Sequence, residues 1–237
     1  MASANTTWKV LPHQPIEKLC DRMWRVEGEL GMAGMKRVMT VVQRADDQLI
    51  IHNAIALGDA EMAEIDAWGK VAMIAVPNGY HRMDARVFAD RYPAAEIVCP
   101  KGSRARVEKV VKVARTYDEI PSDEVVTFEH VDGTKQREGV MIVRANDGTS
   151  VVINDVVLNM PHGSGFHGFV IRYVTASSGG PRVSRLSRIA FVSDTAALRG
   201  HLERLAGLPD LRRVIVSHHV VIDDNPAAVL REVARAL

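Results

Sequence analysis

The sequence of 237 residues is long enough for one large α/β domain or two small ones. Its hydrophobic fraction of 47% and charged fraction of 25% are ordinary for a globular protein, and 30 basic against 29 acidic residues give a net charge of +1. This balance excludes a strong overall attraction to polyanions, so we expect neither nucleic acid nor a membrane as a partner.

Cysteine content and the first residues bear on location. Cys20 and Cys99 are the two cysteines, so the sequence has no disulfide framework and no closely spaced metal-binding pair. Residues 1–20 lack the apolar core of a signal peptide. No apolar run approaches the roughly 18–20 residues that span a bilayer. We therefore expect a protein of the reducing cytoplasm.

Hydrophobic patterning predicts alternating strands and helices along the whole chain. Two turn signals, Asp46-Asp47 and Asn146-Asp147-Gly148, predict hairpins. The predicted strands are 23–27, 37–43, 49–55, 71–76, 96–99, 125–129, 140–144, 151–158 and 213–217. The predicted helices are 59–69, 84–91, 101–114, one that Asp194 caps, and one that begins at Asn225 and Pro226.

Residues 161–188 are rich in glycine, serine and histidine, and we expect an irregular excursion there. The chain has no solenoid-type repeat, no low-complexity tract and no obvious linker. The sequence therefore predicts a single domain over residues 1–237.

Polar residues follow several predicted strands directly, which is where α/β proteins place ligands. The most informative loop is 77–84 (PNGYHRMD), after the buried run 71–76. Asp155 lies within the apolar run 151–158, and His218-His219 follow the last strand. His130 ends another strand. Since a buried carboxylate is costly without a partner, Asp155 is either a site residue or the partner of an arginine or of backbone amides.

This order of elements resembles the metallo-β-lactamase superfamily over roughly residues 23–237. The resemblance rests on a hairpin, a helix, a buried strand with a polar loop, the strand region 92–100, a histidine after a strand, an aspartate in an apolar run and a final His-His. It implies a four-layer αββα sandwich of two mixed β-sheets. It also implies one or two zinc or iron ions that activate a hydroxide.

The family's His-x-His-x-Asp-His loop is altered in residues 76–84, and two registers are open. In one, Asn78 and Tyr80 replace the first two histidines and Met83 the last. In the other, which we favour, His81 is the final histidine of the motif. Val76 and Asn78 then replace the first two histidines, and Tyr80 replaces the aspartate. Either way the first metal site loses its defining pair of histidines.

The remaining family positions are better preserved. The resemblance matches His130 to the histidine of the third motif, and Asp155 to the bridging aspartate. It matches His218 to the terminal ligand, with His219 where glycine is usual. In the favoured register His81, Asp155 and His218 hold one metal ion, a donor set that suits zinc or ferrous iron. A degenerate subgroup of unknown function, with a Pro-Asn-x-x-His loop, is the closest resemblance.

Two functions follow, and both stay open at this point. The first is a metal-dependent hydrolase of a small ester, thioester or lactone. Its metal ligands are drawn from His81, His130, Asp155 and His218, and its catalytic residues are Tyr80 and His81. The second is a metal-free ligand-binding or protein-interaction module on the same fold.

If the protein is a metal-free module, we expect Asn78, Tyr80 and His81 to form a hydrogen-bonding pocket. His162 and His219 are further candidate ligand contacts. Metal-independent acid–base catalysis by His81 with Asp84 or Asp155 is a third hypothesis. Zinc, iron or no metal at all remain open, as does a homo-oligomer, and we expect a small-molecule ligand.

Overall fold

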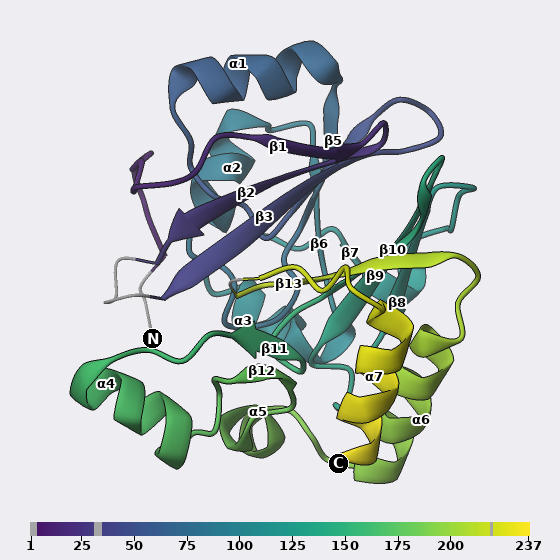
Figure 1. The fold of residues 1–237 in the computed structure, drawn as a ribbon. Helices are drawn as coiled ribbons and strands as arrows, with labels where there is room; N and C mark the ends of the chain where they lie inside the picture. The colour runs from purple at the N-terminus through teal and green to yellow at the C-terminus, as the bar shows by residue number, and fades with distance from the viewer. Residues whose placement is uncertain (1–3, 31–34, 219) are drawn as a thin grey trace.

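The computed structural model describes residues 4–30, 35–218 and 220–237, with the backbone alone at 166 and 167. Two β-sheets pack face to face, and helices cover the outer face of each (Figure 1). Each sheet contains both parallel and antiparallel pairs. The fold is therefore the four-layer αββα sandwich of two mixed β-sheets that the resemblance implies.

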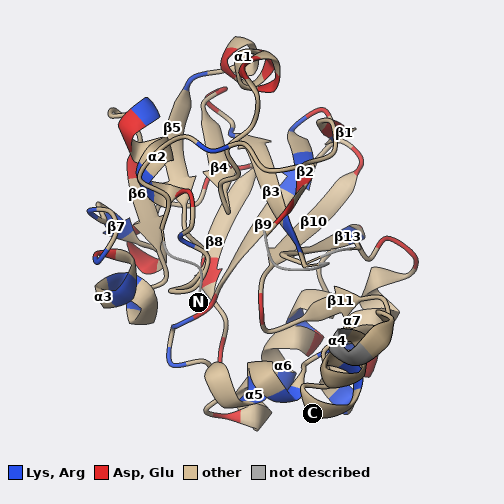
Figure 2. Ribbon diagram, turned by 90° about the vertical axis from the view of Figure 1, so that its left-hand side faces the viewer, with Lys and Arg blue, Asp and Glu red and all other residues tan. Residues whose placement is uncertain are grey.

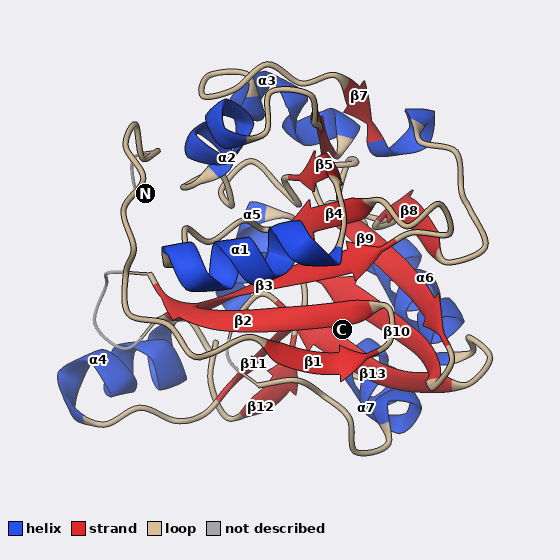
Figure 3. Ribbon diagram, turned by 90° about the horizontal axis from the view of Figure 1, so that it is seen from above, coloured by secondary structure: helices blue, strands red, loops and turns tan. Residues whose placement is uncertain are grey.

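The first sheet contains seven strands in chain order. They are β1 (Glu17–Cys20), β2 (Met23–Glu29), β3 (Lys36–Gln43), β4 (Leu49–His52), β5 (Val71–Ala75), β6 (Glu96–Cys99) and β7 (Arg115–Thr116). The pairs from β1 to β4 are antiparallel, and those from β4 to β7 are parallel. Helices α1 (Asp59–Trp68) and α2 (Ala85–Arg91) lie on its outer face, and α1 runs alongside β3 in the view from above (Figure 3).

The second sheet has the strand order β13-β10-β9-β8. Its strands are β8 (Val126–His130), β9 (Gly139–Ala145), β10 (Gly148–Ile153) and β13 (Leu211–Val216). Helices α6 (Thr195–Ala206) and α7 (Pro226–Arg235) pack on its outer face. Asp194 caps α6 through the N–H groups of Ala196 and Ala197, and Asn225 caps α7. Both predicted caps are confirmed.

Between β10 and α6 the chain forms a separate small unit. It consists of β11 (Leu158–Met160), α4 (Gly165–Phe169), the π-helical turn η3 (Val170–Val174), β12 (Gly180–Arg182) and α5 (Arg185–Ala190). Strands β11 and β12 pair with each other in a two-stranded sheet. The expectation of an irregular excursion is therefore wrong, because short helices and this ribbon organise most of the segment.

Three apolar layers hold the sandwich together. In β3, Met39 and Val41 face the helices α1 and α2, whereas Val38 and Val42 face the second sheet. This alternation follows from the two-residue period of a strand, and β10 shows it between the central layer and α6 and α7. Most of the strand ribbon is uncharged in Figure 2, and charged positions lie mainly on helices and loops.

Two other predicted elements differ from the structure. The helix expected at 101–114 is limited to the turn η1 (Lys101–Ser103) and the short helix α3 (Arg104–Val107). The strand expected at 151–158 ends at Ile153, so Asp155 lies in the turn that follows β10. A further turn, η2 (Tyr117–Glu119), precedes β8. No helix in the described ranges is long and apolar enough to cross a bilayer.

Candidate metal centre

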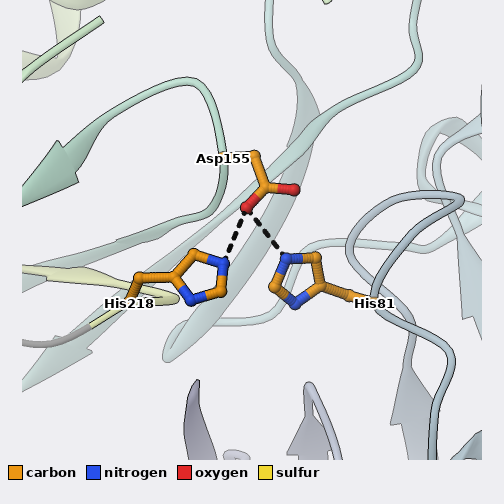
Figure 4. A group of neighbouring side chains, drawn as sticks. All are labelled: His81, Asp155 and His218. Carbon is orange, nitrogen blue, oxygen red and sulfur yellow. Dashed lines mark hydrogen bonds and ion pairs between the residues drawn. The ribbon is translucent and has the colours of Figure 1, made fainter. Parts of the chain in front are cut away.

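Three side chains converge at one end of the sandwich (Figure 4). The Nε2 atom of His81 lies 2.9 Å from Oδ1 of Asp155, and the Nε2 atom of His218 lies 3.1 Å from the same oxygen. The three possible ligand atoms lie within 4.8 Å of one another. The side chains are 9%, 16% and 11% exposed for His81, Asp155 and His218, so solvent has restricted access to the group.

The convergence follows from the topology. His81 lies in the loop after β5, Asp155 follows β10, and His218 follows β13. Because β10 and β13 are parallel neighbours, their carboxyl ends bring Asp155 and His218 to the same edge. The N–H of Val38 in β3 donates to the carbonyl of Ser217 over 2.9 Å, which joins the two sheets at this edge.

Local hydrogen bonds shape the loop that carries His81. The side-chain oxygen of Asn78 accepts from the N–H groups of Tyr80 and His81, over 2.8 and 3.2 Å. An asparagine side chain that bonds the backbone two and three residues on forms a tight turn. This turn, in the sequence Pro-Asn-Gly-Tyr-His, places His81 where its imidazole contacts Asp155.

Each histidine is oriented through its other ring nitrogen. The carbonyl of Lys36 lies 2.6 Å from Nδ1 of His218, and this nitrogen must donate. Oδ1 of Asn53 lies 3.0 Å from Nδ1 of His81, while the amide nitrogen of Asn53 donates to the carbonyl of Val38 over 2.7 Å. These partners assign the proton to Nδ1 in both rings.

This tautomer decides whether a cation fits. In neutral rings with the proton on Nδ1, both Nε2 lone pairs point at a carboxylate oxygen, so three acceptors meet without a donor between them. Either added protons or a metal ion must stabilise such a group. Metal-ligating histidines ordinarily donate their other N–H to a carbonyl or carboxylate, as both do here. The residues therefore fit a metal ion.

Charge and burial act together on this group. Burial alone would raise the pKa of Asp155, but the charges and hydrogen bonds of His81 and His218 outweigh it and hold the pKa well below its ordinary value. Burial alone would lower the pKa of His218, yet the hydrogen bond and charge of Asp155 raise it. The carboxylate is therefore ionised, as a metal ligand must be.

The second oxygen of Asp155 is held by a buried amide. The side-chain nitrogen of Asn78 donates to Oδ2 of Asp155 over 3.0 Å and to Oε2 of Glu138 over 2.8 Å. Glu138 is fully buried, and burial, with the charge of Asp155 adding to it, raises its pKa well above the ordinary value. Asn78 is therefore buried and positions Asp155 from inside the protein.

The other predicted site residues lie outside the group of three. Nε2 of His130 accepts from the N–H of Lys101 over 3.0 Å, and His130 lines a surface depression of about 490 Å³. The exposed His162 bonds Ser178 near the β11–β12 ribbon. Tyr80 is 44% exposed. His219 lies outside the described residues.

Two polar residues of the site were not predicted from the sequence. Asn53 follows β4 with a φ of 56°, a left-handed conformation that asparagine tolerates better than most residues. A polar residue directly after the apolar run of β4 was the available signal for it. Glu138 lies in an ordinary polar loop before β9, and nothing local in the sequence predicts its burial.

This chain is similar to known proteins in its structure, whereas comparison of its sequence finds no match. No protein-family model matches the sequence, and no curated protein is significantly similar to it. Solved structures match over nearly the whole chain. FIM-1 metallo-β-lactamase from Pseudomonas aeruginosa, in a mono-zinc form, is 13% identical with a TM-score of 0.60, and the match covers 96% of this chain and 97% of that one. The chain has the metallo-β-lactamase fold.

Two further metallo-β-lactamase structures agree. One from Hirschia baltica is 14% identical with a TM-score of 0.61, covering 93% of this chain and 98% of that one. DIM-1, exposed to ceftazidime, is 11% identical with a TM-score of 0.63, covering 96% and 99%. Similarity at this identity establishes the metallo-β-lactamase fold and leaves activity to be argued from the site. Membership of the degenerate subgroup stays a prediction.

Proposed function

We propose that this protein is a metal-dependent hydrolase with one metal ion held by His81, Asp155 and His218. The observation that carries the proposal is the convergence of two Nε2 atoms and one carboxylate oxygen, with each Nδ1 proton already donated elsewhere. The substrate class is a small ester, thioester or lactone. His130 is not included among the ligands, since its Nε2 already accepts a backbone N–H.

The donor set supports zinc or ferrous iron and a single ion. Two imidazoles and a carboxylate are ligands that both metals accept, and three protein ligands leave a coordination position open. Such an ion supplies Lewis acidity, which polarises a carbonyl and lets water ionise near neutral pH. The amide of Asn78 donates to Oδ2 of Asp155, which positions the carboxylate with Oδ1 toward the two Nε2 atoms.

The protein's own residues have separate roles in this proposal. Asn53 and the carbonyl of Lys36 orient the two imidazoles. Tyr80 contacts the substrate, because its ring is exposed beside His81. Its ring edge meets Phe191 at 5.5 Å between centroids, and the guanidinium of Arg106 lies 4.4 Å above it. The guanidinium of Arg106 therefore adds a positive charge beside Tyr80, and this charge would attract a polar substrate.

Elemental analysis of the freshly purified protein tests the proposal. We expect about one equivalent of zinc or iron. The double variant His81→Ala/Asp155→Ala should lose it, since one ligand atom remains. His130→Ala is the matched control, because it also removes an imidazole but one outside the group, and should keep the metal.

Absence of metal from the wild type, even after incubation with zinc and ferrous salts, would rule out the hydrolase. It would leave the metal-free ligand-binding module as the function of this fold.

Orientation of His81 by Asn53 has its own measurable effect. Asn53→Gly keeps the left-handed backbone but removes the acceptor for the Nδ1 proton of His81. Loss of such a partner ordinarily weakens metal binding about 10–100-fold. Competition with a chelator of known affinity measures this change. Asn146→Gly, in the exposed turn before β10, should leave the affinity unchanged; an equal loss in both variants would contradict the role of Asn53.

A further inference from the structure

The segment between Asp155 and Asp194 has an unusual charge composition. Residues 156–193 contain Arg172, Arg182, Arg185 and Arg188 but no aspartate, glutamate or lysine. Four of the 30 basic residues thus lie here and 26 elsewhere, while all 29 acidic residues lie elsewhere. The segment carries +4 and the remainder −3. The net charge of +1 therefore conceals a strong local excess of positive charge.

The same segment contains most of the exposed apolar surface. Eight large hydrophobic side chains are exposed in the described part of the chain, and five of them belong to α4, η3 and α5. These five are Phe169, Tyr173, Val174, Leu186 and Ile189, with Ile189 85% exposed. Isolated exposed apolar residues are normal, but such a concentration indicates an interaction surface.

The elements that carry these apolar and basic side chains contact one another. The rings of Phe169 and Tyr173 lie 4.9 Å apart, and the guanidinium of Arg172 lies 5.1 Å above the ring of Tyr173. Arg185, at the start of α5, donates from its side chain to the carbonyl of Tyr173 over 3.2 Å, which joins α5 to η3. Leu186 and Ile189 lie three residues apart on α5 and so share a face.

We propose that this surface, Phe169, Arg172, Tyr173, Val174, Arg185, Leu186 and Ile189, binds the surface of an anionic lipid bilayer. Exposed aromatic and aliphatic side chains enter the headgroup boundary, and arginines beside them pair with lipid phosphates and carboxylates. The protein lies on the bilayer and does not cross it. The expectation of no membrane partner rested on the charge of the whole chain, and this segment departs from that average.

Charge and chemistry favour a bilayer over other occupants. In a symmetric pair of copies, this face would meet itself, so its arginines would repel one another. Phosphates of a nucleic acid would suit the arginines but leave Val174, Leu186 and Ile189 exposed to water. An anionic bilayer complements both properties, and the absence of any carboxylate from the segment removes repulsion by its headgroups.

The surface lies close to the candidate metal centre without depending on it. In Figure 1, α4 and α5 lie beneath the sandwich. The hydroxyl of Ser187, in α5, donates to the carbonyl of Asp155 over 2.5 Å. None of the proposed lipid contacts is a candidate metal ligand, so bilayer binding can be measured whether or not the protein holds metal.

Sedimentation with vesicles tests the proposal. We expect the full-length protein to bind vesicles of phosphatidylcholine with phosphatidylserine, to bind pure phosphatidylcholine vesicles far less, and to dissociate as salt is raised. Each arginine near an anionic bilayer strengthens binding about fivefold, so Arg172→Gln/Arg185→Gln should weaken it about 25-fold. Arg212→Gln/Arg235→Gln, which neutralises two exposed arginines outside the segment, should bind as the wild type does.

A second pair of variants tests the apolar part. Leu186→Ser/Ile189→Ser should also lose vesicle binding, while Val10→Ser, at an exposed apolar position near the N-terminus, should retain it. All replaced residues are exposed, and unchanged thermal melts check that every variant is folded. The proposal is overturned if the wild type binds neither vesicle, if it binds both equally, or if it binds only an acidic protein.

Discussion

Arg37→Met is expected to lower the free energy of unfolding by about 3–5 kcal/mol, since it leaves a buried carboxylate without its cation. Nη2 of Arg37 lies 2.7 Å from Oδ2 of Asp84, and the two side chains are 3% and 0% exposed. Asp84 also accepts from the side chain of Asn5 over 2.6 Å and from the N–H of Ala56 over 3.2 Å. Those bonds cannot replace the lost charge. Denaturant unfolding followed by circular dichroism measures the change.

An exposed ion pair provides the control for this experiment. Arg86 and Asp90 are more than half exposed and lie one helical turn apart, so Arg86→Met should change stability by about 0.5 kcal/mol or less. In the double variant Arg37→Met/Asp84→Asn no charge remains buried, and part of the stability should return. If Arg37→Met and Arg86→Met lower the free energy of unfolding equally, the buried pair does not stabilise the protein more than the exposed one.

The metal-free protein is expected to lose stability steeply as pH falls from 6.5 toward 3, and His52 is expected to contribute much of the loss. His52 is 1% exposed at the end of β4, and its Nε2 has no hydrogen-bond partner among the described residues. Burial, with repulsion from the nearby His81, lowers the pKa of His52 from 6.5 to about 3. Its imidazole therefore stays neutral in the folded protein at a pH where it would be charged in the unfolded chain.

The sign of the effect follows from which state binds the proton first. Between pH 6.5 and about 3 the unfolded chain holds a proton at His52 that the folded protein does not, so acid favours unfolding. The cost approaches about 1.4 kcal/mol for each pH unit in this window. Above pH 6.5 the stability from this residue is fully present.

His52→Leu isolates this contribution. Burial also lowers the pKa of His130 and His201, and these residues titrate in both proteins, so the difference between the two curves of stability against pH reports His52 alone. We expect the curve of the variant to be flatter below pH 6.5, measured by urea unfolding in the presence of a chelator. Parallel curves would show that His52 is charged in the folded state as readily as in the unfolded one.

Most elements could be predicted because local signals and packing agree. Strand β6 was predicted at its observed bounds, and α7 begins at Pro226 with Asn225 as its cap. The hairpin between β9 and β10 turns at Asn146-Asp147-Gly148, where Gly148 has a φ of 122° that suits glycine. In each case a turn or cap residue limits an apolar run, so local sequence alone determines the boundary.

The failed helix at 101–114 shows where local patterning is insufficient. Val107 and Val111 have the four-residue spacing of a helix face, and both are buried against the first sheet. However, β-branched residues are poor helix formers, and here the chain leaves the helix at Val107. The N–H of Ala114 then bonds the carbonyl of Ile97, which brings β7 to the edge of the sheet. Tertiary pairing outweighs the helical pattern.

The site could be predicted only in part, for a related reason. His81, Asp155 and His218 each follow an apolar strand, and that local signal identified them as candidates. His130 has the same signal, yet its imidazole bonds Lys101 instead of joining the group. Which strand ends meet is determined by sheet order, and β10 and β13 are neighbours although more than 50 residues separate them in the sequence. Asn53 and Glu138 contribute through contacts of this long-range kind.

The support of the two histidines by β3 has an evolutionary consequence. Lys36 orients His218 through its carbonyl, and Val38 holds Asn53 through its own carbonyl. Main-chain groups are present in every residue, so mutations that exchange the side chains at 36 and 38 leave these bonds in place while the strand persists. This half of the support is inherited with the fold itself. Sequences can therefore drift far apart along β3, and a descendant can retain the geometry of the site after recognisable similarity has gone.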